Sequence, residues 1–166
     1  MLDEIKNRLQ LGKYDFVLTL FPSPDTHGAH KAATLTALSA ISQMQGEKPV
    51  VLSCQDSLPN ATAPLDWTGF KSPQHPFTVA PQRYTVDLAT KFGFNNAMDY
   101  RIVLDWVIAA QKSQGLFQMS AGQAGKEEFT ILDTATPSAA EKADQLFRAL
   151  SQTAAHPVPL PSASSP

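Results

Sequence analysis

The chain is poor in cysteine and in charged residues. Cys54 is its single cysteine among 166 residues, so no disulfide can form within the chain. Charged residues make up 17% of the sequence and the formal net charge is -2, whereas a nucleic-acid surface needs a concentrated excess of lysine and arginine. No apolar run has the length of a membrane span, and the first residues lack the basic-then-apolar order of a signal peptide. These absences favour a cytoplasmic protein that binds no nucleic acid.

The remaining composition is that of an ordinary globular domain. Hydrophobic residues account for 43% of the sequence, and a chain of this length forms one domain with a sizeable core. We expect an α/β domain over residues 1–135 and a helix over residues 136–153. The Pro-, Ser- and Ala-rich composition of residues 154–166 predicts a disordered tail.

The clearest local pattern is a strand, a helix and a second strand. Residues 16–21 form an apolar run with little alternation, which is typical of a strand that is covered on both faces. A helix rich in Ala, Leu and Thr is predicted over residues 27–44, with Thr26 as its N-cap, and residues 49–54 form the next apolar run. Together they have the size of a βαβ crossover.

The rest of the chain predicts a long irregular loop over residues 55–76 and then further short elements. These are strands at 77–79 and 84–88, a helix capped by Asn95 or Asn96, a strand at 127–132 and a final helix that begins with a Ser138–Glu141 capping box. Trp106 lies in the apolar stripe of the first of these two helices, so we expect it in the core.

Two histidines three residues apart, His27 and His30, lie where the first strand meets its helix. Their spacing places both imidazoles near one face of the first helical turns. Open α/β sheets bind ligands at the carboxyl ends of their strands, and imidazole is a common zinc ligand. Asp25, in the preceding loop, is a further candidate for a ligand or a catalytic base. A pair of polar surface histidines is the alternative interpretation.

Three stretches of the chain resemble one known family. The run Tyr14–Ala33 looks like a signature of the PIG-L/LmbE-type N-deacetylases, in which a strand and a loop precede a helix that carries H-x-x-H. Tyr100–Gly115 is similar to a later helix of that family, and Glu128–Thr130 fits its closing segment. The resemblance covers residues 1–132.

Members of this family use a metal, usually zinc, to remove an acetyl group from N-acetylglucosamine-type or related amide substrates. The resemblance implies zinc as the cofactor and His30 as a metal ligand. It also implies that His27 is the catalytic histidine that stabilises the oxyanion and protonates the leaving amine. Bound zinc polarises the amide carbonyl and lowers the pKa of its water to about 7. Asp25 is the candidate catalytic base, although the spacing does not require it.

The sequence departs from the family at two points. The family's N-terminal Ala-His-Pro-Asp-Asp-Glu motif supplies the other metal ligands and the base, and it has no counterpart here. Gln111 stands where the family often has a later histidine. We therefore expect a Rossmann-like three-layer sandwich with a mostly parallel sheet, incomplete at its N-terminus. We also expect the chain to be inactive without a partner chain or segment that supplies the motif.

The long loop and the strand after it add two candidate substrate contacts. Trp67 offers an aromatic face that suits a sugar ring, although anchoring of the loop is an equal alternative, and Arg83 is a weaker candidate. We expect Cys54 to be a buried apolar residue rather than a nucleophile.

Three functions stay open at this point. The first is a metal-dependent N-deacetylase. The second is a non-catalytic carbohydrate-binding or assembly module derived from that fold, because an incomplete sheet leaves an edge that favours association with another chain. The third is an unrelated α/β domain with a fortuitous H-x-x-H.

Overall fold

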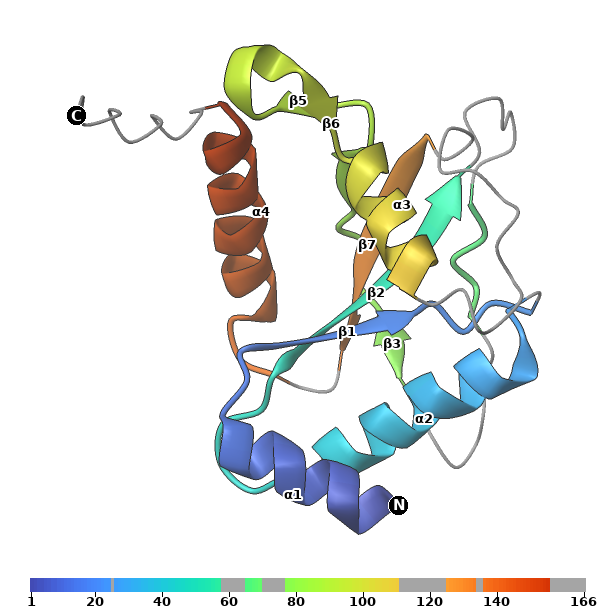
Figure 1. Cartoon of the computed structure of the whole chain (residues 1–166). Coiled ribbons are helices and arrows are strands. Elements are labelled where there is room, and N and C mark those ends of the chain that lie inside the picture. Colours follow the sequence, from blue (N-terminus) through green and yellow to red (C-terminus); the bar gives the residue numbers. More distant parts are fainter. Residues whose placement is uncertain (25, 58–64, 70–76, 111–124, 134–135, 156–166) are drawn as a thin grey trace.

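The computed structural model describes residues 1–24, 26–57, 65–69, 77–110, 125–133 and 136–155 (Figure 1). The elements in chain order are α1 (Leu2–Gly12), β1 (Phe16–Leu20), α2 (Gly28–Ser42), β2 (Val50–Ser57), β3 (Thr78–Val79), β4 (Tyr84–Asp87), β5 (Lys91–Phe92), the 3-10 helix η1 (Phe94–Asn96), β6 (Met98–Asp99), α3 (Arg101–Ala110), β7 (Lys126–Asp133) and α4 (Ala139–Ala155). Among these described helices, none has the length and apolar character needed to span a membrane. The predicted tail lies almost entirely outside the described residues.

The main sheet has the order β1-β2-β7-β3, and β4 also pairs with β7. β1 and β2 are parallel, with Phe16 opposite Val50 and Leu20 opposite Cys54. The three pairings of β7, with β2, β3 and β4, are antiparallel. The expected α/β content is therefore confirmed. The described sheet is mixed, with one parallel and three antiparallel pairings, and does not confirm a mostly parallel sheet. An apolar run without alternation is typical of a strand that is covered on both faces, and it says nothing about the direction of the neighbouring strand. The expectation that both faces are covered is wrong for β1, because its Leu18 and Leu20 side chains are exposed.

Helices cover both faces of this sheet, with α1 and α2 on one side and α4 on the other (Figure 1). Val17 and Val51 point toward α2, where they pack with Leu38 and Ile41. The alternate side chains of β1 and β2 point toward α4 and pack with its apolar face. On this second face the members of the cluster include Phe16, Val50, Leu52, Ala143, Leu146 and Phe147.

α3 begins later than the sequence predicts and is more exposed. Asn95 and Asn96 both have positive φ, and they belong to η1 rather than to the start of α3. Asp99 precedes α3 instead, where its Oδ1 accepts a hydrogen bond from the backbone N–H of Arg101 at 3.2 Å. None of the residues Arg101–Ala110 is buried, and the Trp106 side chain is 59% exposed. The prediction of Trp106 in the core is wrong, because an apolar stripe does not specify what covers it.

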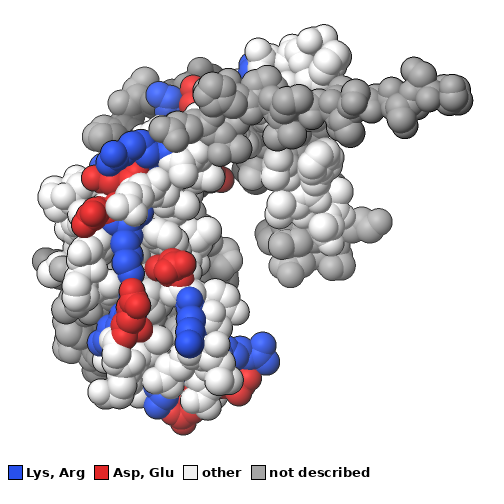
Figure 2. Space-filling model, turned by 90° about the vertical axis from the view of Figure 1, so that its left-hand side faces the viewer, with Lys and Arg blue, Asp and Glu red and all other residues white. Residues whose placement is uncertain are grey.

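Charged side chains are interleaved on the surface near α4. Figure 2 shows lysine and arginine beside aspartate and glutamate, mainly over the left-hand part of the face that it displays. One of the contacts is an ion pair between Lys142 of α4 and Glu47, with a Nζ–Oε1 distance of 2.6 Å. Pairing with Lys142 lowers the pKa of the Glu47 carboxyl.

Candidate functional site

The candidate site lies at the carboxyl ends of β1 and β2, where α2 begins (Figure 1). The connection out of β1 is held by the burial of Phe21 and by two hydrogen bonds. Phe21 is buried and its backbone N–H donates to the Cys54 carbonyl at 2.8 Å, which continues the parallel ladder by one residue. The buried Thr34 hydroxyl donates to the Leu20 carbonyl at 2.8 Å. The end of β1 is therefore tied to both β2 and α2.

Thr26 stabilises the loop instead of capping the helix. Its hydroxyl donates to the Phe21 carbonyl at 2.7 Å and lies 2.9 Å from the Ser23 hydroxyl. This engagement leaves the N-cap position to His27, so the prediction of Thr26 as N-cap is wrong. A sequence pattern identifies a residue that can cap, but a competing acceptor in the loop decides whether it does.

His27 is exposed and is the N-cap of α2. Its Nδ1 accepts a hydrogen bond from the backbone N–H of Ala29 at 3.3 Å. A ring nitrogen that accepts carries no proton, so in the neutral imidazole the proton is on Nε2. That N–H is the group that can donate to a substrate oxygen.

His30 lies on the first turn of α2 and is also exposed. The centroid of its ring is 5.9 Å from that of His27, with 62° between the ring planes. The structure therefore brings together the two imidazoles that the sequence paired. Asp25, the third candidate of this group, lies outside the described residues.

A catalytic zinc site needs three protein ligands, and a structural one needs four. Across the described part of the chain, no group of three or more His, Cys, Asp or Glu side chains is placed to hold a metal ion. The two imidazoles of α2 alone do not fit a zinc site. Zinc binding and the ligand role of His30 stay predictions.

The two candidate substrate contacts lie against each other. The guanidinium carbon of Arg83 is 4.5 Å from the centroid of the Trp67 ring. The Trp67 ring in turn packs against Phe21, with centroids 4.8 Å apart and 69° between the planes. Partial burial lowers the pKa of the Arg83 guanidinium, and the Glu128 carboxylate opposes that effect. These contacts support anchoring of residues 65–69, while a sugar contact stays a prediction.

A row of hydroxyl groups crosses the sheet beside this anchor, and sequence reasoning missed it. Thr19, Ser53 and Thr130 are in register on β1, β2 and β7. The Thr19 hydroxyl donates to Ser53 Oγ at 2.9 Å, and a guanidinium nitrogen of Arg83 donates to Thr130 Oγ1 at 2.8 Å. Ser53 and Thr130 are fully buried. No local pattern identifies this row, because it depends on the register of three strands.

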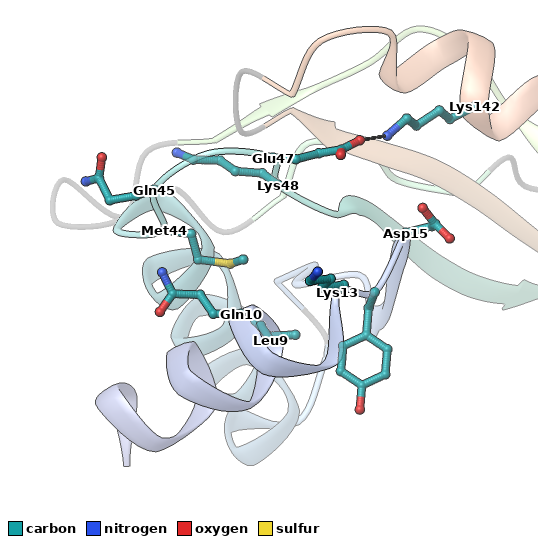
Figure 3. Close-up of a pocket in the computed structure, with 10 residues that line it drawn as sticks. Leu9, Gln10, Lys13, Asp15, Met44, Gln45, Glu47, Lys48 and Lys142 are labelled. Carbon is teal, nitrogen blue, oxygen red and sulfur yellow. Dashed lines mark hydrogen bonds and ion pairs between the residues drawn. The ribbon is translucent and has the colours of Figure 1, made fainter.

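A cavity of about 390 Å³ lies at the other end of the sheet, before β1 and β2 begin (Figure 3). Its lining includes Lys13, Asp15, Lys48 and the Glu47–Lys142 ion pair. Neither histidine of α2 lines this cavity. It is therefore separate from the candidate site.

Comparisons with known proteins add no relative. No protein-family model matches the chain, and no match is found among curated proteins or among solved structures. The PIG-L/LmbE resemblance therefore stays a prediction that depends on the residues quoted for it.

Proposed function

We propose that the chain contributes the histidine-bearing part of a metal-dependent N-deacetylase that acts on N-acetylglucosamine-type or related amide substrates. One observation carries this proposal: two neighbouring, exposed imidazoles, His27 and His30, lie at the carboxyl ends of a parallel strand pair. That is the end at which α/β sheets bind ligands. We also propose that the fold is Rossmann-like, with β1, α2 and β2 as one of its strand–helix–strand units. The proposed location of the protein is the cytoplasm.

The two histidines have different roles in this proposal. Hydrolysis of an amide places negative charge on the carbonyl oxygen, and a nearby N–H stabilises that charge. The Nδ1 of His27 is engaged by the Ala29 amide, so its Nε2–H is the donor for this task. His30 is assigned as the metal ligand. Because the described residues hold too few donors, the remaining ligands and the base are assigned to groups outside them, Asp25 included.

A second candidate function is a non-catalytic carbohydrate-binding or assembly module. The observation that favours it is the small number of metal donors among the described residues. In this alternative, the Trp67 and Arg83 side chains contact a sugar and no bond is broken.

Calorimetric titration with Zn²⁺ tests the role of His30 in the intact chain. We expect His30→Ala to weaken zinc binding by about tenfold or more, and His27→Ala to weaken it less. His156→Ala is the matched control, because it also removes one imidazole and has no assigned role in metal binding. Equal zinc affinity in all four proteins would contradict the proposal.

Acetate release from N-acetylglucosamine conjugates separates the two functions. The deacetylase proposal predicts zinc-dependent release when a segment with the Ala-His-Pro-Asp-Asp-Glu motif is supplied in trans. Release should be lost in His30→Ala and retained in His156→Ala. Binding of the conjugate without release under those conditions would favour the non-catalytic module.

A further inference from the structure

In the part of the chain that the structure describes, β1 is the terminal strand of the main sheet and its outer edge carries no paired strand. Among the described strands, β1 pairs only with β2. An open edge presents a row of backbone N–H and C=O groups that another extended strand can bind.

The register identifies the groups on this edge. Val50 N–H donates to the Asp15 carbonyl, and Phe21 N–H donates to the Cys54 carbonyl, so the odd-numbered residues of β1 bond toward β2. Alternate residues of a strand bond to opposite sides, so the backbone groups of Phe16, Leu18 and Leu20 point outward. The Leu20 carbonyl already accepts a hydrogen bond from the Thr34 hydroxyl, whereas no such contact is described for the Leu18 carbonyl at the middle of this edge.

The side chains of the same residues leave an apolar surface uncovered. Leu18 is 67% exposed and Leu20 is 43% exposed, although both point to the face of the sheet that α4 covers elsewhere. Edge strands are usually protected by a charged residue, a proline or a bulge. The sequence of β1, Phe-Val-Leu-Thr-Leu, contains no charge and no proline, and its ladder with β2 runs without a bulge.

We propose that β1 pairs with β1 of a second copy of this chain, antiparallel, across a two-fold axis beside Leu18. This pairing sets Leu18 opposite Leu18 of the partner subunit, and Phe16 opposite the partner subunit's Leu20. The central Leu18 pair can exchange both backbone hydrogen bonds, because the N–H and C=O groups of Leu18 point outward. The inference does not rest on the proposed function.

A second copy fits this edge better than an unrelated strand for two reasons. The pairing is self-complementary about its central residue, as a two-fold interface requires. It also opposes no like charges, because Phe16–Leu20 carries none, and like charges directly opposite each other destabilise a strand pair. A five-residue strand buries little surface, so we expect a weak dimer with a dissociation constant of about 1–100 µM.

Sedimentation equilibrium of the full chain over a range of concentrations tests the proposal. We expect the dimer fraction to rise with concentration and Leu18→Lys to weaken dimerisation by about tenfold or more, because it places two like charges opposite each other. Leu11→Lys is the matched control: Leu11 is also an exposed leucine but belongs to α1 rather than to β1, and this variant should dimerise like the wild type. A monomer at every concentration, or an unchanged dimer in Leu18→Lys, would overturn the proposal.

Amide hydrogen exchange of the unaltered chain gives a second test that needs no folded variant. Exchange at the Leu18 amide should slow as the concentration rises, because this N–H becomes bonded only in the dimer. The Thr19 amide points toward β2 and should exchange at a rate independent of concentration. Exchange at Leu18 that does not respond to concentration would contradict the pairing.

Discussion

Replacement of Trp67 by alanine separates an anchoring role for this residue from a role in substrate binding. The ring packs against Phe21 at 4.8 Å and lies under the Arg83 guanidinium at 4.5 Å. An aromatic pair of this kind contributes about 0.5–1.5 kcal/mol and an exposed cation–π contact about 0.5–1 kcal/mol. The substitution also removes the apolar burial of a half-buried ring. Adding this loss to the two contacts, we expect Trp67→Ala to lower the free energy of unfolding by about 2–3 kcal/mol.

Urea unfolding followed by circular dichroism measures this loss. With a slope of about 2 kcal/mol per molar urea, the midpoint should fall by about 1–1.5 M. Trp106→Ala is the control, because that side chain is 59% exposed, and it should cost less than about 1 kcal/mol. A double-mutant cycle with Arg83→Ala should give a coupling of about 0.5–1 kcal/mol.

One result would refute the anchoring role. If Trp67→Ala unfolds at the wild-type urea concentration but binds N-acetylglucosamine conjugates more weakly, then Trp67 contacts substrate and does not hold residues 65–69. If Trp67→Ala instead lowers the urea midpoint and leaves sugar binding unchanged, the anchoring role is supported.

Three further predictions concern stability. Burial and a hydrogen bond to Asp144 raise the pKa of Tyr84 to about 12. The stability that depends on the protonated phenol should therefore be lost as the pH rises from about 10 to about 12, and the loss should be about 1–2 kcal/mol after allowance for solvent screening. Urea titrations should show no such loss in Tyr84→Phe. Thr34→Val removes the donor to the Leu20 carbonyl and should cost about 1 kcal/mol in the same assay. Leu38→Ala should cost about 2–5 kcal/mol because the side chain is buried, and an equal cost for the exposed Leu11→Ala would contradict the assigned core.

Local patterns in the sequence predict much of the first half of the fold. The apolar run at 16–21 corresponds to β1, and the Ala- and Leu-rich run at 27–44 corresponds to α2. These predictions succeed because periodicity and composition are local properties. The direction of β7 against β2 and the exposure of Trp106 are not predictable in this way, since both depend on contacts between distant segments.

The candidate site shows the same division. The H-x-x-H spacing predicts that His27 and His30 share one side of the first turn of α2, and their rings lie 5.9 Å apart. The spacing does not predict that His27 caps the helix, because that depends on Thr26 being engaged by the Phe21 carbonyl. A two-residue motif likewise cannot identify the other ligands of a metal site, because those ligands come from distant segments that tertiary structure brings together.

Long-range proton–nitrogen NMR spectra of the imidazoles during zinc titration show directly whether His30 binds zinc. The chain has four histidines, so each ring can be followed separately. We expect the ring nitrogens of His30 to shift first as zinc is added, and His27 to keep its proton on Nε2. Equal shifts at all four histidines, or no shift at His30, would contradict the assignment of the α2 histidines as part of a metal-dependent site.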